Sequence, residues 1–223
     1  MLSNLLNRRH SCRSFRDDEV PRHVLDQILE MAQRTPSWGN TQPWRVYMVS
    51  GQVRDGLARA LSADESQPSP DLTFPDAYDG KFRERRRESG WMLYRALGIA
   101  SGDRAASAAH ARRNLEFFGA PHVAVITAPT SLGVYGAVDC GLYVQSLLLA
   151  ATALGIASCP QAAIAARSQV LHAQLGIPQD ESVVCGIALG YEDTSHPANS
   201  IRVPRIPLDH SVSHRAASED GSS

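Results

Sequence analysis

The sequence predicts a single α+β domain in which a mixed central sheet is flanked by helices. Its 223 residues suit one domain of ordinary size. Segments with strand and helix patterns are interspersed along the chain. The distances between the strands vary too much for regular βαβ winding, and this irregularity favours a mixed sheet.

The first third of the chain alternates helices with one strand. Apolar residues recur at helical spacing over residues 21–34, and Pro21 suits the first turn of that helix. A loop rich in turn residues follows at 35–43, and residues 44–49 have the pattern of a short strand. A second helix is expected over 53–61, and three prolines predict an irregular excursion over 66–75.

Residues 81–116 have a helical pattern but carry many charges. A charged run of this kind commonly faces water, which is the simpler interpretation. The alternative is a lid over a pocket, whose arginines attract the phosphates of a nucleotide.

The remaining elements end in a polar tail. Residues 123–127 predict a buried strand, 137–154 a long apolar helix, 165–175 a shorter helix and 183–189 another strand. Residues 213–223 are small and polar, which predicts a disordered tail after a single domain spanning 1–212.

The long apolar helix raises the question of a membrane. No charged residue occurs between Asp139 and Arg167. Polar residues such as Gln145 and Thr152 interrupt the segment, however, and the rest of the chain has the composition of a soluble protein. A helix that is apolar on every side is usually buried in a core or a subunit interface, and we expect that here.

Charge and cysteine content indicate a reduced, cytosolic protein. The chain has 22 basic and 23 acidic residues, so nothing attracts it as a whole to nucleic acid or an anionic membrane. Its four cysteines form no CxxC pair, and its start lacks a basic segment followed by an apolar one. The sequence also lacks GxGxxG, P-loop, HExxH and GxSxG motifs, so we expect neither a metal nor a nucleophilic serine.

Three clusters carry residues suited to binding. Residues 8–15 place three arginines, a histidine and two serines together, and guanidinium forks suit phosphate oxygens. Residues 35–44 carry Asn40 and Gln42, whose amides match the edge of a heterocycle. Residues 201–208 place Arg205 in an extended segment. Taken singly, these clusters are also explained as a basic surface turn, a loop held by prolines and an ordinary surface arginine.

Together the clusters resemble the nitroreductase family in content and order. The resemblance runs from about residue 8 to residue 212 and rests on four motifs, at 8–15, 35–44, 153–161, and 189–193 followed by 205–208. It implies an FMN-binding fold that forms an intertwined homodimer. It further implies a flavoprotein oxidoreductase that takes electrons from NADPH or NADH. Nitroaromatic compounds would be reduced through nitroso to hydroxylamine, with donor and acceptor using the same face in turn.

The resemblance also implies which residues bind FMN, and both chains contribute. Residues of one chain would hold the phosphate and ribityl chain, namely Arg9, Ser11, Arg13 and Arg205, with His10 alongside. The partner chain would supply Pro36, Ser37, Asn40 and Gln42. Pro160, Gln161, Ala162 and Ala163 would pass the flavin ring, and Asn114 would lie near its pyrimidine end. Family members often have an acidic residue and a glycine near Ala162 and Ala163, so side-chain roles there do not transfer.

Residues 66–116 look like the enlarged cap of a subgroup. We expect aromatic residues on or beside the cap to contact the acceptor, namely Trp91, Tyr94 and Phe118, although an ordinary packed hairpin explains them too. No catalytic side chain is expected, because the cofactor carries the chemistry. The rival functions are a quinone, enone or dehalogenating flavoenzyme on the same fold, and a non-catalytic flavin-binding or sensing protein.

Overall fold

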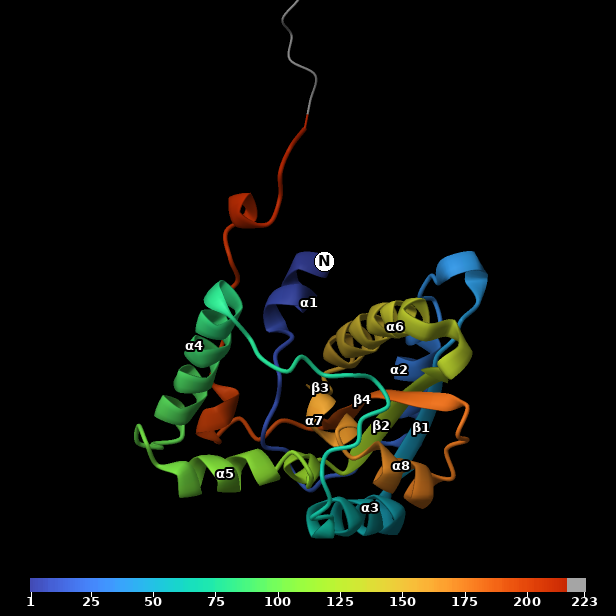
Figure 1. The fold of residues 1–223 in the computed structure, drawn as a ribbon, viewed down its shortest axis with the longest axis horizontal. Helices are drawn as coiled ribbons and strands as arrows, with labels where there is room; N and C mark the ends of the chain where they lie inside the picture. Colours follow the sequence, from blue (N-terminus) through green and yellow to red (C-terminus); the bar gives the residue numbers. More distant parts are fainter. Residues whose placement is uncertain (216–223) are drawn as a thin grey trace, which may run out of the picture.

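A four-stranded sheet forms the centre of the protein, whose computed structural model describes residues 1–215 (Figure 1). All neighbouring strands are antiparallel. We expected a mixed sheet, with some strands parallel. Among the described residues, the only parallel pairing is an isolated bridge between Ser11 and Ser158. The α+β class is confirmed. The strand order is β1 (Arg45–Ser50), β2 (His122–Pro129), β4 (Glu181–Gly190) and β3 (Ala157–Gln161).

Alternate residues of β2 face two separate hydrophobic cores. Val123 and Val125 belong to one core, whereas Ala124 and Ile126 belong to the other. This is the period of two that a strand buried on both faces requires. The helices that cover the two faces are α3 (Gly51–Ala63) and α8 (Ser168–Leu175) on one side, and α2 (Arg22–Ala32) and α6 (Gly133–Ala153) on the other (Figure 1).

Helix α6 is the apolar helix that the sequence indicates, and it begins four residues before the expected start. Residues Thr130–Ala153 have the length and mean hydropathy, 1.4, of a membrane span. Nevertheless Tyr143 and Leu147 are fully buried in the core that α6 shares with α2. Gly136 permits close packing, since a Cβ there would lie 3.0 Å from the Cβ of Leu132. The helix therefore has the packing of a core helix.

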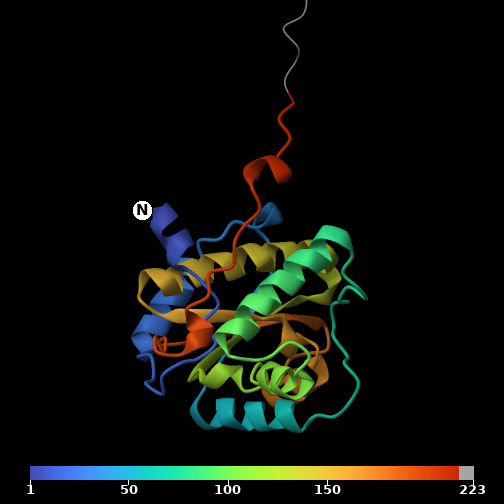
Figure 2. The same cartoon turned by 90° about the vertical axis from the view of Figure 1, so that its left-hand side faces the viewer.

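The charged stretch forms two helices. Helix α4 (Gly80–Ala96) ends before a turn, and α5 (Arg104–Arg112) follows it. Neither helix contains a buried residue. Figures 1 and 2 show α4 on the side of the molecule where β3 forms the edge of the sheet.

The excursion that leads into α4 is fixed to the body by two ion pairs. The Asp71 carboxylate lies 2.9 Å from Nε2 of His172 on α8 and also accepts the backbone N–H of Val183 at 2.7 Å. Asp64 lies 3.2 Å from the Arg167 guanidinium. These contacts position the start of the cap relative to the core.

Strand β3 was not expected from the sequence. It is short, lacks β-branched residues and contains Pro160. Proline is tolerated there because β3 pairs with β4 alone and forms an edge of the sheet. Two short helices complete the fold, α1 (Leu2–Arg8) before the basic cluster and α7 (Ala162–Ala165) directly after β3. Most of the tail that we expect to be disordered, at 216–223, lies outside the described residues.

Candidate functional site

A cationic hollow lies between the segment that follows α1 and residues 201–205 near the other end of the chain. Its volume is about 450 Å³. The structure thus brings together five residues that the sequence analysis assigns to one site, Arg9, His10, Ser11, Arg13 and Arg205. The other lining residues are Leu6, Asn7, Ser89, Ile201, Arg202 and Val203.

The arginines of this hollow lack acidic partners. Within residues 1–215, no carboxylate lies at ion-pair distance from Arg9, Arg13 or Arg205. Burial lowers the pKa of Arg9, and the like charge of Arg205 lowers it further. An anion with several oxygens would relieve this repulsion, and phosphate suits the planar guanidinium fork.

Asn199 holds the backbone that carries Arg13, and sequence reasoning missed it. Its Oδ1 accepts the backbone N–H of Arg13 at 2.7 Å. Its Nδ2 donates to the carbonyls of Ser14 at 2.8 Å and Asp193 at 2.9 Å. Asn199 is buried, its bond to Ser14 is buried as well, and the other two bonds are partly buried. A lone asparagine in a short turn gives no signal of this role, because its partners are distant in sequence.

His10 connects the cationic hollow to the motif after β4. Its Nε2 lies 3.0 Å from the Glu192 carboxylate, and its Nδ1 lies 3.0 Å from the carbonyl of Arg8. Both contacts fix the plane of the imidazole ring. The ring is therefore held at the hollow by Glu192.

The end of β3 presents a row of exposed residues around one buried amide. Pro160, Ala162 and Ala163 are exposed, whereas Gln161 is only 2% exposed. Nε2 of Gln161 donates to the carbonyl of Asn114 at 2.8 Å. Oε1 of Gln161 is buried and has no hydrogen-bond partner among the residues that the structure describes. The structure therefore brings Gln161 and Asn114 together and leaves one acceptor unused beside them.

The loop assigned to the partner chain lies far from the cationic hollow of its own chain. The backbone N–H of Trp38 donates to the carboxylate of Asp139, near the start of α6. Thr152, near the end of α6, lines a hollow together with Arg9 and His10. At 1.5 Å per residue, Asp139 and Thr152 are about 20 Å apart along the helix.

This loop has a fixed conformation of its own. Nε2 of Gln42 donates to the carbonyl and to Oδ1 of Asn40, and the backbone N–H of Gln42 donates to Oγ of Ser37. Asn40 and Gln42 both have positive φ, at 57° and 46°. Figure 1 shows the loop beyond the start of α6, away from α1 and α4. Within one chain, Pro36, Ser37, Asn40 and Gln42 therefore do not join the arginines.

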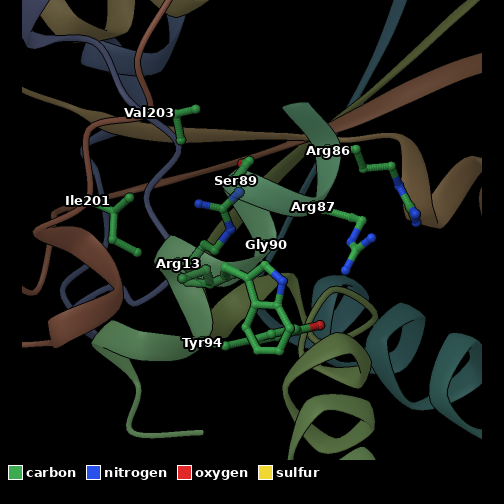
Figure 3. A pocket seen from close by; sticks show the side chains of 10 residues that line it. Arg13, Arg86, Arg87, Ser89, Gly90, Tyr94, Ile201 and Val203 are labelled. Atoms are coloured by element: carbon green, nitrogen blue, oxygen red, sulfur yellow. The ribbon is translucent and has the colours of Figure 1, made fainter. Parts of the chain in front are cut away.

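A second hollow adjoins the first and is lined by α4 (Figure 3). Its volume is about 460 Å³, and it shares Arg13, Ser89, Ile201 and Val203 with the cationic hollow. Trp91 and Tyr94 both line it, with ring centroids 6.4 Å apart and an edge-to-face angle of 88°. The cap helix therefore places two aromatic rings beside the arginine site.

Phe118 lies apart from those two aromatic residues. It is only 2% exposed and belongs to the core beside Phe117. Both residues have positive φ, at 55° and 56°, which is rare for bulky side chains. Its burial indicates that Phe118 packs in the core, and it does not line the hollow that Trp91 and Tyr94 share. In the part of the chain that the structure describes, no three His, Cys, Asp or Glu side chains gather as metal ligands.

The chain matches one family model and is similar to several known proteins. The family model described as Nitroreductase family matches residues 6–191. Nitroreductase NfnB of Mycolicibacterium smegmatis is 40% identical over 207 residues, which cover 92% of this chain and 88% of that protein. A 4-nitrobenzoate reductase of Nocardioides sp. is 35% identical over 216 residues, covering 92% and 85%. The solved structure of the FMN-dependent nitroreductase NfnB from Mycobacterium smegmatis in complex with NADPH superposes with a TM-score of 0.91 at 38% identity, over 96% of this chain and 98% of that one.

Proposed function

Because the chain belongs to the nitroreductase family, we propose that it is an FMN-dependent oxidoreductase that passes electron pairs from NADPH or NADH to nitroaromatic compounds. The observation that carries this proposal is the cationic hollow, where arginines from both ends of the chain meet with no acidic partner among residues 1–215. The relatives named for 4-nitrobenzoate and for NADPH support the acceptor class and the donor.

The residues of the hollow fit an FMN phosphate. Arg9 and Arg205 supply charge-assisted donors, and Ser11 adds a neutral hydroxyl. The buried Oε1 of Gln161 has no partner in the described residues and suits an N–H of a bound heterocycle. On this proposal Pro160, Ala162 and Ala163 form the exposed surface that the flavin ring passes.

Bound FMN supplies the two-electron redox chemistry, and the negative charge of its reduced form is stabilised by nearby donors and cations. The chain itself binds and orients the reactants. Trp91 and Tyr94 provide aromatic surface on which a flat acceptor stacks. Since the two hollows adjoin, we propose that the nicotinamide nucleotide and the acceptor occupy the same space in turn, which gives ping-pong kinetics.

We further propose that the complete site needs two chains. The loop with Ser37 and Asn40 lies at the opposite end of α6 from the arginines, so one chain cannot present both groups to one ligand. The outer face of α6 is apolar and exposed at Val134, Val138 and Leu142, which follow each other one turn apart. A second copy that covers this stripe would bury it and bring its own loop to the arginines. We also propose that the protein works in the cytosol.

Absorbance spectroscopy tests the proposed activity. Purified protein should carry flavin absorbance that bleaches when NADPH is added without oxygen and returns when 4-nitrobenzoate follows. Flavin that bleaches but recolours only with a quinone would indicate a quinone reductase on the same fold. Flavin that NADPH leaves oxidised would indicate a non-catalytic flavin-binding protein.

A further inference from the structure

The hollow beneath α4 carries more positive charge than a neutral acceptor requires. Three arginines line it, Arg13, Arg86 and Arg87, and no acidic residue of the described part of the chain does. The same walls carry the rings of Trp91 and Tyr94. Aromatic surface combined with uncompensated cations suits a flat ligand that bears an anionic group.

The three arginines differ in how much of their binding capacity is already used. Arg13 donates to the carbonyl of Ser11 and faces both hollows. The Arg86 guanidinium lies over the ring of Tyr78, 5.4 Å from its centroid. Within residues 1–215, Arg87 has no side-chain hydrogen bond, ion pair or aromatic ring contact. Arg87 therefore keeps its full fork of donors for a ligand.

Arg87 also lies on the helix face that carries the aromatic rings. Arg87, Trp91 and Tyr94 follow each other at spacings of four and three residues. These spacings put three side chains on one face of an α-helix. A ligand ring that stacks beside Trp91 or Tyr94 would thus have the Arg87 guanidinium at the edge of the ligand. Figure 3 shows Arg13 approaching the same hollow from a different segment.

We propose that this hollow binds the anionic oxygens of a flat aromatic ligand and that Arg87 selects for them. The inference rests on the proposed function, because it concerns the reactants of the same site. Two reactants offer that chemistry, a nitroarene with a carboxylate and the phosphate of the nicotinamide nucleotide. Arg87 is a specificity residue in this account and takes no part in electron transfer.

The test compares Arg87→Gln with the control Arg83→Gln in the FMN-loaded protein. Arg83 is exposed on the same helix one turn away and does not line the hollow, so it controls for loss of charge alone. Steady-state kinetics give kcat/KM for 4-nitrobenzoate and for nitrobenzene at fixed NADPH, and for NADPH and NADH at fixed nitrobenzene. Binding is measured separately by titrating the flavin absorbance with benzoate and with the neutral isostere benzamide.

Arg87→Gln should reduce kcat/KM for 4-nitrobenzoate on the order of tenfold, the effect of one charge-assisted hydrogen bond near the surface, and leave nitrobenzene unchanged. Benzoate affinity should fall with it, and benzamide affinity should not. If Arg87→Gln instead lowers kcat/KM for NADPH but not for NADH, the anion that Arg87 binds is the additional phosphate of NADPH.

Equal changes for charged and neutral ligands, or equal effects of Arg83→Gln and Arg87→Gln, would overturn the proposal. A wild-type protein that reduces no nitroarene would refute the proposed function instead. In that case the benzoate titration still tests the anion site, since it requires no turnover.

Discussion

Helices α6 and α4 are both long, and the protein uses them in opposite ways. Helix α6 buries eight of its 21 residues, and six of these belong to the core shared with α2 and the sheet. Helix α4 has 17 residues and buries none, and its charges and aromatic rings line a hollow instead. From this contrast we infer that α6 contributes mainly to stability, and we propose that α4 contributes ligand selectivity. Substitutions should therefore change one property without the other.

The largest effect is expected in α6. Leu147 is fully buried, so Leu147→Ala removes apolar contacts and leaves a cavity. The free energy of unfolding should fall by about 2–5 kcal/mol in urea denaturation. Arg83→Ala on α4 is the matched control and should change it by less than about 0.5 kcal/mol. Equal losses from the two helices would remove the distinction between them.

The next effect concerns the cationic hollow. Arg9→Ala or Arg205→Ala should weaken FMN binding by roughly 1.5–3 kcal/mol, because each removes a charge-assisted phosphate contact. Flavin titration measures the affinity, and circular dichroism checks that the fold is retained. Unchanged affinity in both variants would place the phosphate elsewhere.

Asn199 links the core to this hollow, and its substitution should affect both properties. Asn199→Ala leaves the backbone N–H of Arg13 without its acceptor. It also removes one donor each from the carbonyls of Ser14 and Asp193, which still accept the backbone N–H groups of Asp193 and His196. Each buried group left unsatisfied costs about 1–3 kcal/mol, less where water enters. We expect lower stability together with weaker FMN retention. Full FMN affinity in a destabilised variant would limit Asn199 to a packing role.

A smaller effect is expected for the aromatic residues of α4. Trp91→Ala or Tyr94→Ala should lower kcat/KM for bulky nitroaromatics by about 1 kcal/mol, the worth of one stacking contact, without loss of FMN. Kinetics with one small and one bulky acceptor measure the change. An unchanged ranking of the two acceptors would leave these rings as packing residues of the cap.

The pH dependence of the cap attachment should be the smallest effect. Burial acts to lower the pKa of His172, but hydrogen bonds to the Ile177 carbonyl and to Asp71 outweigh it and raise the pKa above 6.5. The protonated pair therefore stabilises the fold fully below about pH 6.5, and this contribution is lost as the pH rises through the raised value. Asp71→Asn should reduce stability more at pH 6 than at pH 9 in urea denaturation. An equal reduction at both values would contradict a charged pair.

How well the sequence predicted each part depended on how local the signal was. Helices α2, α3 and α8 and strands β1, β2 and β4 were predicted because apolar periodicity marks them directly. Strand β3 was missed, since Pro160 and a lack of β-branched residues hide an edge strand whose pairing with β4 is long-range. The bounds of α4 and α5 were not predicted, because charged residues continue across the turn between them.

The same limit applies to the site. The motifs predicted one group of Arg9, Ser11, Arg13 and Arg205, because arginine clusters are visible in the sequence, and the structure brings these residues to one hollow. The hydrogen bonds of Asn199 join segments that only the fold brings together, and no local pattern marks them. Whether a side chain such as Phe118 faces a ligand or the core also depends on backbone angles that the sequence does not display.

The central claim is that the FMN site forms only where two chains meet, and sedimentation with flavin detection tests it most directly. Val138 is 52% exposed on the outer stripe of α6, and Val53 is 59% exposed on α3. We expect the wild type and Val53→Glu to sediment as dimers with one FMN per chain. Val138→Glu should sediment as a folded monomer without flavin, because the buried charge opposes association. A folded monomer that retains FMN, in the wild type or in Val138→Glu, would contradict the two-chain site.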